Sequence, residues 1–270
     1  FGTVADFMLF TGNGAIGNTG ISTITGNIGS NVGEITGFGA PSVVNGVIEN
    51  SNAVTTKAYE DLKVACAQLD GLTKTVDHIA GFGNPTGETI GPGVYSINSA
   101  VEITGTLILD AQGDPDAMFI FKIYGALNSV AASEVLLINK ASAANVYWYA
   151  TGAIGFGANT TMVGTAIADT GAVSLGAGGS ITGLLYPTVG SISKDSFEAS
   201  IPVRDPAYNY LGAYTSNGTP LYLEDPSDNV SAATQKTINT SLPDNYPVPE
   251  YNPQYITSSF DTNLKIEGST

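Results

Sequence analysis

The chain has 270 residues, 43% of them hydrophobic, and a mean hydropathy of +0.13, values typical of a globular protein with a sizeable core. Its net charge of −15 argues against a protein that binds nucleic acids or anionic membranes. A single cysteine, Cys66, and a single histidine, His78, exclude an intrachain disulfide, a thiolate metal cage and most catalytic triads, so we expect neither a metal nor a cofactor.

The composition also bears on where the protein works. The chain lacks the long apolar run, about 18 residues, that a membrane-spanning helix needs. It begins at Phe1 without a methionine, which we interpret as a mature or trimmed form. Acidity, few lysines and abundant Thr, Ser and Asn favour a secreted or cell-surface protein.

The first 50 residues consist of short strand-like segments separated by glycines. Asn13–Asn18 (NGAIGN) closely echoes the distant segment Thr151–Gly157 (TGAIGFG). Similar segments so far apart in the chain predict one structure built from both ends of a domain. Phe38–Ser51 interrupts the pattern, and we expect it to cap an open end of that structure, where unpaired strand edges would invite aggregation.

Residues 52–70 have a helical period. Apolar residues recur on one face of an α-helix, at Val54, Ala58, Leu62, Ala65 and Leu69. Ser51 or Asn52 can cap the first turn, and Gly71 follows the end. Because the stripe is narrow and built partly from small residues, we expect the helix to lie flat on a sheet. Cys66, beside the stripe, is expected to be a buried and unreactive thiol.

Residues 101–150 return to strand-like segments, of which Met118–Tyr124 and Val146–Ala150 are apolar at nearly every position. A strand that is buried on both sides has this composition. One side faces the core, and the other needs a cover, for which the helix is the natural candidate. This predicts three faces per turn of chain, one under the helix and two free, and it places Trp148 under the helix.

Residues 146–203 repeat every 19 residues. Ala153-Ile154-Gly155-Phe156 returns as Ala172-Val173-Ser174-Leu175 and again as Ser191-Ile192-Ser193-Lys194. Such a period, without helix-forming residues, predicts a solenoid of short strands in which equivalent side chains form columns about 4.8 Å apart.

Within this repeat, alternate residues of each strand point in opposite directions. Ile154, Val173 and Ile192 are expected to point inward, and the outward positions hold only small, uncharged residues: Ala153, Gly155, Ala172, Ser174, Ser191 and Ser193. A column of Thr151, Thr170 and Thr188 is expected at the neighbouring corner. No charge occurs before Lys194, which we place at the edge of this face.

Residues 204–270 differ in character. They are acidic, contain seven prolines and many tyrosines, and show no echo of the repeat. We therefore expect a domain over residues 1–203, followed from about Arg204 by an extension, a linker or the start of a further domain of the same longer chain.

These segments, in this order, resemble the microbial ice-binding proteins. The resemblance covers about residues 1–203 and is carried by TGISTITGNIGSNVGEITGF, the helix NAVTTKAYEDLKVACAQLDGL, ITGTLILDAQGDPDAMFIFKI and NVYWYATGAI. It implies a mostly β fold, a right-handed β-solenoid of triangular cross-section with one long α-helix packed along one face. It also implies adsorption to an ice crystal surface and inhibition of ice growth or recrystallisation, which we expect of a monomer.

In that family, ice adsorbs to a flat face that the helix leaves free, often marked by Thr-Ala/Gly-x-Thr/Asn. The first two motif positions are present at Thr11-Gly12, Thr151-Gly152 and Thr170-Gly171, whereas the final Thr or Asn is absent each time. The resemblance and the repeat together predict these ice-binding residues: Thr151, Ala153, Gly155, Thr170, Ala172, Ser174, Thr188, Ser191, Ser193, Thr11 and Asn13.

Two other functions remain open. The solenoid can be a structural or adhesive module of a larger surface protein, with its threonines in ordinary strand positions. A carbohydrate-active enzyme would need paired carboxylates in a groove. Asp110, Asp114 and Asp116 cluster, but Asp114-Pro115-Asp116 is better interpreted as a turn, so we do not expect an enzyme.

Overall fold

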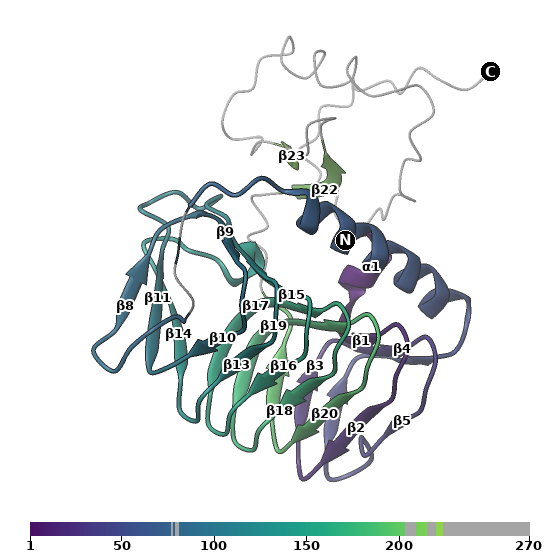
Figure 1. Cartoon of the computed structure of the whole chain (residues 1–270). Coiled ribbons are helices and arrows are strands. Elements are labelled where there is room, and N and C mark those ends of the chain that lie inside the picture. The colour runs from purple at the N-terminus through teal and green to yellow at the C-terminus, as the bar shows by residue number, and fades with distance from the viewer. Residues whose placement is uncertain (77, 79–80, 203–208, 215–219, 224–270) are drawn as a thin grey trace, which may run out of the picture. The chain divides into compact units, whose positions relative to one another are not determined.

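The computed structural model describes residues 1–76, 78, 81–202, 209–214 and 220–223. Within residues 1–202 the chain winds into stacked coils that form a β-solenoid (Figure 1), with short 3₁₀ helices η1 (Gly2–Asp6) and η2 (Ala143–Asn145). Beyond them, β22 (Asn209–Tyr214) pairs in antiparallel fashion with β23 (Pro220–Leu223). The predicted boundary at Arg204 and most of the predicted C-terminal region lie outside the described residues.

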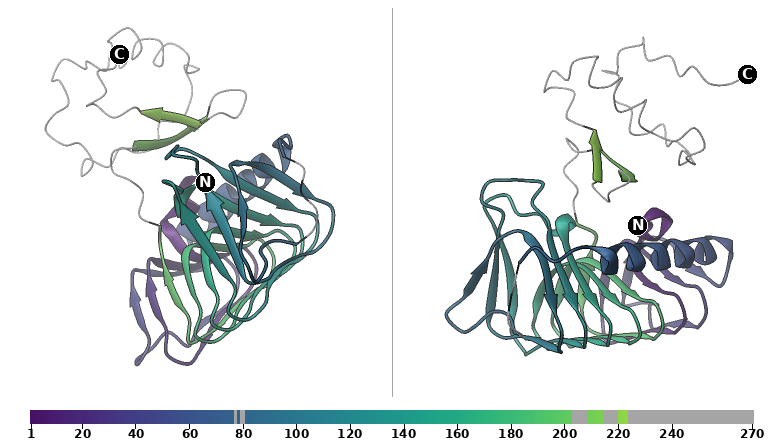
Figure 2. Two further views of the ribbon diagram at one scale, coloured as in Figure 1. Left: turned by 90° about the vertical axis from the view of Figure 1, so that its left-hand side faces the viewer. Right: turned by 45° about the horizontal axis from the view of Figure 1, so that its top comes forward.

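The solenoid has three faces of parallel strands, as the sequence predicts. The first, which we call the helix face, lies under α1 (Ala53–Gly71) (Figure 2). In spatial order its strands are β9 (Gly93–Ile97), β12 (Phe119–Ile123), β15 (Val146–Ala150), the second halves of β17 (Thr161–Ala168) and β19 (Ser180–Pro187), β1 (Phe7–Thr11), β4 (Asn27–Ser30) and β7 (Ile48–Asn50).

Two faces remain uncovered by the helix. The third face consists of β8 (Glu88–Ile90), β11 (Thr106–Asp110), β14 (Glu134–Ile138), the first halves of β17 and β19, β21 (Glu198–Ser200), β3 (Thr23–Thr25) and β6 (Val43–Asn45). The seven-stranded face consists of β10 (Val101–Ile103), β13 (Leu127–Ser129), β16 (Ile154–Phe156), β18 (Val173–Leu175), β20 (Ile192–Asp195), β2 (Ile16–Thr19) and β5 (Ile35–Thr36).

The order of coils along the solenoid differs from their order in the chain. The coils of the first 50 residues stack on the last coil of the repeat, where β1 pairs with β19, β2 with β20 and β3 with β21. We call this contact between the two ends of the domain the joint. It confirms the prediction, made from the echo between NGAIGN and TGAIGFG, of one solenoid built from both ends.

The helix α1 forms where the helical period predicts it. Asn52 caps its first turn, accepting a hydrogen bond from the backbone N–H of Thr55 at 3.0 Å. Its buried side chains pack on Ile120, Tyr149 and Ile167 of the helix face and include Ala58, Leu62, Cys66 and Leu69. Val54, which we predicted to be in the stripe, is instead 50% exposed, and Thr55 takes the buried position in the first turn.

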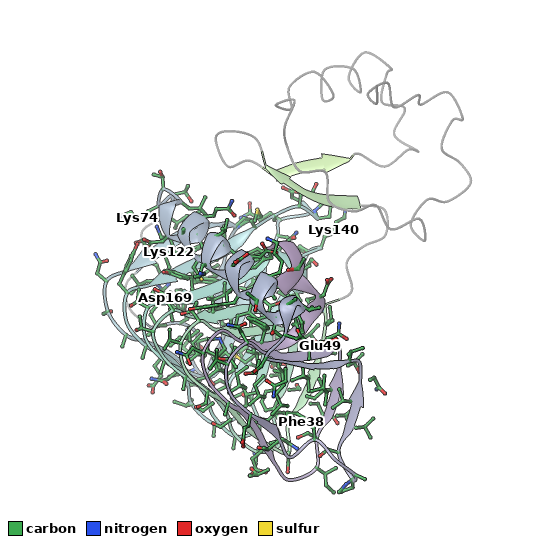
Figure 3. All side chains as sticks on the ribbon, turned by 90° about the vertical axis from the view of Figure 1, so that its right-hand side faces the viewer. Phe38, Glu49, Lys74, Lys122, Lys140 and Asp169 are labelled. Atoms are coloured by element: carbon green, nitrogen blue, oxygen red, sulfur yellow. The ribbon has the colours of Figure 1, made fainter. Side chains whose placement is uncertain are left out.

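Two polar contacts fix the C-terminal end of α1. The buried Lys122 on β12 donates hydrogen bonds to the backbone carbonyls of Asp70 and Leu72, where helix carbonyls lack intrahelical partners (Figure 3). Burial, and secondarily the carboxylate of Asp169, raises the pKa of the Cys66 thiol to about 12. The thiol is therefore protonated at neutral pH, as expected for an unreactive cysteine.

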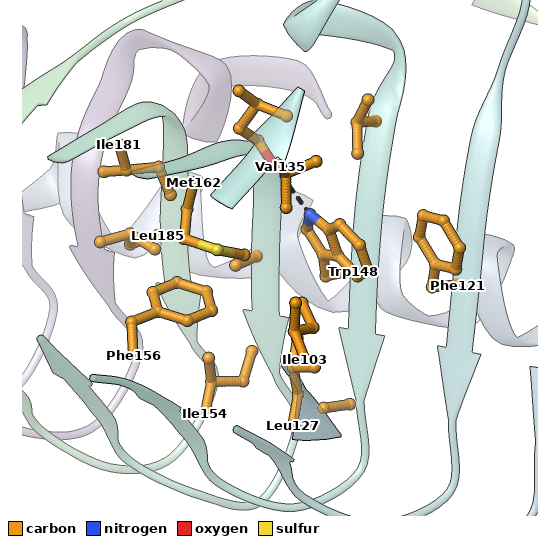
Figure 4. Packing of buried hydrophobic residues seen from close by; sticks show 14 of the residues in the cluster. Ile103, Phe121, Leu127, Val135, Trp148, Ile154, Phe156, Met162, Ile181 and Leu185 are labelled. Carbon is orange, nitrogen blue, oxygen red and sulfur yellow. Dashed lines mark hydrogen bonds between the residues drawn. The ribbon is translucent and has the colours of Figure 1, made fainter. Parts of the chain in front are cut away.

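Aromatic side chains fill part of the solenoid interior. Phe121 and Trp148 stack with ring centroids 4.1 Å apart, and the indole Nε1–H of Trp148 donates to the carbonyl of Val163 at 2.8 Å (Figure 4). Trp148 thus points into the core, and our placement of it under the helix is wrong. Tyr149, the next residue, takes that position, because neighbouring residues of a strand point to opposite sides.

The segment Phe38–Ser51 does not simply cap the solenoid, as we predicted. It supplies β6 and β7, which continue the third face and the helix face by one coil. This coil leaves apolar side chains exposed at the end of the solenoid, with Val43 at 47%, Val47 at 56% and Ile48 at 46%. None of the described helices is long and apolar enough to cross a membrane.

Candidate functional site

Two columns of outward side chains run along the seven-stranded face. The central column occupies one register position in successive strands and consists of Glu102, Asn128, Gly155, Ser174, Ser193, Gly17 and Thr36. The second column precedes the strands, and the carbonyl of each member accepts a backbone hydrogen bond from the coil before it at 2.8–3.0 Å: Ala126, Ala153, Ala172, Ser191, Ala15 and Glu34.

The middle of this surface is uncharged and made of small side chains. Glu102 stands at one end and Glu34 at the other, and the ten residues between them in the two columns are all Ala, Ser, Gly or Asn. Ile154, Val173 and Ile192, their inward neighbours, are at most 1% exposed. Because the core side fills each strand tightly, the outer side is a level and rigid sheet surface.

A column of glycines forms the corner between the helix face and the seven-stranded face. It consists of Gly125, Gly152, Gly171, Gly190, Gly14 and Gly33. A Cβ atom at any of these positions would lie 2.1–3.0 Å from a backbone atom of the neighbouring coil. Glycine is therefore required for the coils to approach this closely, and the column keeps the second outward column in line.

The structure places most of the predicted site residues on this surface. Six of them are exposed, Ala153, Ser174, Ser191, Ser193, Thr170 and Asn13, and three are partly exposed, Thr151, Gly155 and Ala172. Thr11 and Thr188 are corrections, since they are 0% and 5% exposed. Their hydroxyls donate to the backbone carbonyls of Gly190 and Asp169, so they tie coils together at the corner and do not belong to the exposed surface.

The predicted column of Thr151, Thr170 and Thr188 is not continuous. Ile154 pairs with Val173 and Val173 with Ile192, so the position after Thr151 and Thr170 belongs to Val189, which is 47% exposed. Ala150 pairs with Ala168, and Asp169 is therefore an extra corner residue, in register with Thr188. The sequence repeat alone does not show where such an insertion lies.

Lys194 is also placed differently from our prediction. It follows the outward Ser193, points into the solenoid and is 3% exposed, so it does not border the face. The charge nearest to the two columns along β20 is the exposed Asp195, at the corner toward the third face. The uncharged surface therefore continues across the joint onto Ala15 and Gly17.

The sequence reasoning missed four members of the columns, Ala15, Gly17, Ala126 and Asn128. The echo between NGAIGN and TGAIGFG aligns Ala15 with Ala153 and Gly17 with Gly155, and it was sufficient to find the first pair. Ala126 and Asn128 precede the region of regular 19-residue spacing, because a longer loop separates β14 from β15.

The surface lacks the groups that chemistry at a metal or a carboxylate pair would need. Across the described residues, no group of three or more His, Cys, Asp or Glu side chains could hold a metal ion. The backbone N–H of Asp116 donates to the Asp114 carboxylate at 2.9 Å, which is the local hydrogen bond of an Asx turn, as predicted for Asp114-Pro115-Asp116.

Comparison with known sequences gives a consistent family. The family model described as ice-binding-like matches residues 10–197. An ice-binding protein of Nostoc sp. (strain HG1) is 35% identical over 170 residues, which are 63% of this chain and 61% of that protein. Ice-binding protein 1 of Shewanella frigidimarina is 45% identical over 82 residues, 30% of this chain and 9% of that protein.

Solved structures agree in fold. The ice-binding protein of an Antarctic Flavobacteriaceae bacterium superposes with a TM-score of 0.72 and 38% identity, over 75% of this chain and 47% of that one. The ice-binding protein of the Antarctic ascomycete Antarctomyces psychrotrophicus gives 0.70 and 28%, over 75% and 98%. The chain thus spans 61% of the Nostoc protein and less than half of the Flavobacteriaceae one.

Proposed function

The chain belongs to the ice-binding-like family, and from that premise we propose that it adsorbs to ice through the seven-stranded face and so inhibits ice growth or recrystallisation. The observation that carries the proposal is the pair of outward columns, in which ten consecutive small and uncharged residues lie between Glu102 and Glu34. The motif residues Thr151 and Thr170 border these columns at the glycine corner.

The physical argument starts from water at this surface. Methyl groups of alanine do not bind water strongly, and the hydroxyls of Ser174, Ser191 and Ser193 hold it at intervals set by the strand spacing of about 4.8 Å. Without charged groups, no water is drawn into a strongly ordered ionic shell. Each contact is weak, but a rigid array loses little conformational entropy on adsorption, so many weak contacts add up.

The same proposal covers the partner, the location and the chemistry. The partner is the ice crystal surface, and the protein acts as a monomer, with any further domains belonging to the same longer chain. Its acidic, lysine-poor composition supports a secreted or cell-surface location. No reaction is required, because adsorbed molecules stop the ice front between them without changing a covalent bond.

A matched pair of substitutions on one coil tests the face. Ser174 and Thr182 are both exposed, at the centre of adjacent strands on the seven-stranded face and the third face. Ser174→Tyr should abolish retention on a growing ice hemisphere and thermal hysteresis, because the bulky ring holds neighbouring columns away from ice, whereas Thr182→Tyr should leave both unchanged. Thermal unfolding of both variants shows that each remains folded.

The opposite outcome moves the site. Loss of activity only in Thr182→Tyr would place ice binding on the third face. Failure of the unsubstituted chain to bind ice at all would contradict the proposal and favour a structural or adhesive role.

A further inference from the structure

The joint poses a problem of register that the rest of the solenoid does not have. Neighbouring strands elsewhere on the seven-stranded face are joined by one coil of chain, which limits how far they can slide. At the joint, β2 and β20 come from segments about 175 residues apart, with Gly17 opposite Ser193. Chain connectivity therefore does little to prevent the two strands from pairing with a shift.

Side-chain packing also discriminates weakly between registers there. A shift by one residue would turn every inward side chain outward and is excluded by the hydrophobic core. A shift by two residues keeps the alternation intact. The outward residues near the joint are small, Ser191, Ser193, Ala15 and Gly17, and they would tolerate such a shift.

A buried polar cluster occupies the inner side of the joint. The Lys194 ammonium lies 3.3 Å from the Asn18 side-chain oxygen, and the two residues are 3% and 8% exposed. Ser22 donates to the same oxygen at 2.7 Å and accepts from the backbone N–H of Phe197 at 3.2 Å. The Lys194 ammonium also lies 5.5 Å from the centre of the Phe38 ring, which Figure 3 shows at this end of the solenoid.

The amide of Asn18 extends the cluster to the next coil. Its nitrogen donates to the carbonyls of Gly37 at 2.7 Å and Gly20 at 3.2 Å, and to the Ser42 hydroxyl at 3.1 Å. The cluster therefore links three consecutive coils, and two of its contacts cross between the C-terminal and N-terminal segments. Within the described residues no buried side-chain polar atom lacks a hydrogen-bond partner.

We propose that the Lys194–Asn18 pair sets the register of the joint and thereby keeps the seven-stranded face continuous across it. In the native register the ammonium meets an amide oxygen. After a shift of two residues it would face Ile16 or Gly20 and lose its side-chain acceptor inside the core. A buried charge without a partner is strongly destabilising, so the shifted pairings are disfavoured. This inference concerns the joint itself and does not depend on ice binding.

Engineered disulfides report the register directly. In a Cys66→Ala background, Ser193→Cys with Gly17→Cys places two cysteines on directly opposed residues of parallel strands, within bridging distance. A Cβ at Gly17 meets only the Thr36 hydroxyl, at 3.9 Å, so the substitution fits. Ser193→Cys with Ala15→Cys, or with Thr19→Cys, instead reports a shift of two residues, about 6.6 Å along the strand.

The test compares these pairs with and without the cluster. With Lys194 and Asn18 present, only the pair at 193 and 17 should form a disulfide under mild oxidation. In Lys194→Met/Asn18→Leu, the shifted pairs should form at a yield raised by roughly ten-fold, equivalent to 1.4 kcal/mol of lost discrimination. If the double variant still cross-links only at 193 and 17, with an unchanged yield, the inference is wrong.

Two further variants separate register from general stability. Ser129→Ala removes a buried hydroxyl from the same inner column, at a pair of strands joined by one coil, and should produce no shifted disulfide. Lys194→Gln keeps a hydrogen-bond donor toward Asn18 and should restore the native pattern. If the double variant does not fold, the single variant Lys194→Met carries the test, and shifted disulfides in Ser129→Ala would also count against the inference.

Discussion

The two uncovered faces of the solenoid share a backbone architecture but differ in what they present to solvent. On the seven-stranded face, the charges of the two columns stand at the ends, Glu102 and Glu34. On the third face, Glu134 and Glu198 interrupt an outward column, and the column beside it mixes Thr182 and Ser200 with branched apolar residues such as Ile108 and Leu136. Inward positions are predominantly apolar on both faces.

The comparison shows that a parallel sheet alone does not make a level, uncharged surface. Leu136 is 38% exposed and stands higher above the third face than the neighbouring threonines, whereas no outward residue between Glu102 and Glu34 is larger than asparagine. The difference lies only in the outward residues, which do not affect the core. Selection for a function on one face can therefore act without disturbing the fold.

The largest effect is expected at the glycine corner that borders the seven-stranded face. A Cβ at Gly171 would lie 2.4 Å from the backbone nitrogen of Ala153, so Gly171→Ala should force the two coils apart and lower the free energy of unfolding by about 3 kcal/mol. Gly17→Ala, on the same face but in open space, should change it by less than about 0.5 kcal/mol. Denaturant unfolding measures both, and equal losses would mean that the corner does not depend on close approach.

A second effect comes from the inner side of the seven-stranded face, where Lys194 replaces an apolar residue. Burial lowers the pKa of Lys194 to about 8, below the usual value of 10.5 for lysine. Between these two values the unfolded chain binds a proton that the folded chain does not, so the Lys194 contribution to stability rises with pH. Relative to Lys194→Met, wild-type stability should therefore rise between pH 8 and 10.5, by at most about 1.4 kcal/mol per pH unit.

Thermal unfolding of the two proteins at several pH values gives this difference, and a flat difference curve would contradict it. The wild-type curve alone is not sufficient, because Cys66 acts in the opposite direction. Its pKa is raised from 9.0 to about 12, mainly by burial, so it lowers stability as pH rises above 9. Both proteins contain Cys66, and its effect cancels in the difference.

The smallest effect is expected from the glutamates that distinguish the faces. Glu102→Gln/Glu34→Gln extends the uncharged surface by one coil at each end and should raise thermal hysteresis by less than about two-fold, because the contact area grows only by those two coils. Glu134→Gln/Glu198→Gln removes the same charge from the third face and should leave it unchanged. An equal gain from both pairs would indicate a general effect of net charge and would remove the distinction between the faces.

Much of the fold follows from the sequence because its determinants are local or periodic. The 19-residue repeat predicts the solenoid, and the apolar stripe predicts α1 to within one residue at each end. The composition of Met118–Tyr124 and Val146–Ala150 identifies the strands under the helix. These features depend on residues close together in the chain or on a pattern that recurs.

The missed features depend on contacts between distant residues. Lys194 was placed at the edge of the face because of its charge, although the alternation of β20 turns it inward; the buried acceptor that accommodates it, Asn18, lies 176 residues away. Thr188 was misplaced because the extra residue Asp169 shifts the register at one corner. Neither the partner nor the insertion leaves a mark on the local pattern.

The joint has a consequence for the order of events during synthesis. Residues 1–50 leave the ribosome first, yet β1, β2 and β3 find their partners only after β19, β20 and β21 have been made. Until then the N-terminal coils lack the neighbours against which they pack, and closing so long a loop carries an entropic cost that later contacts must offset. Ordinary solenoids can propagate coil by coil from the first residue onward. This one grows from its middle, and the segment translated first docks last.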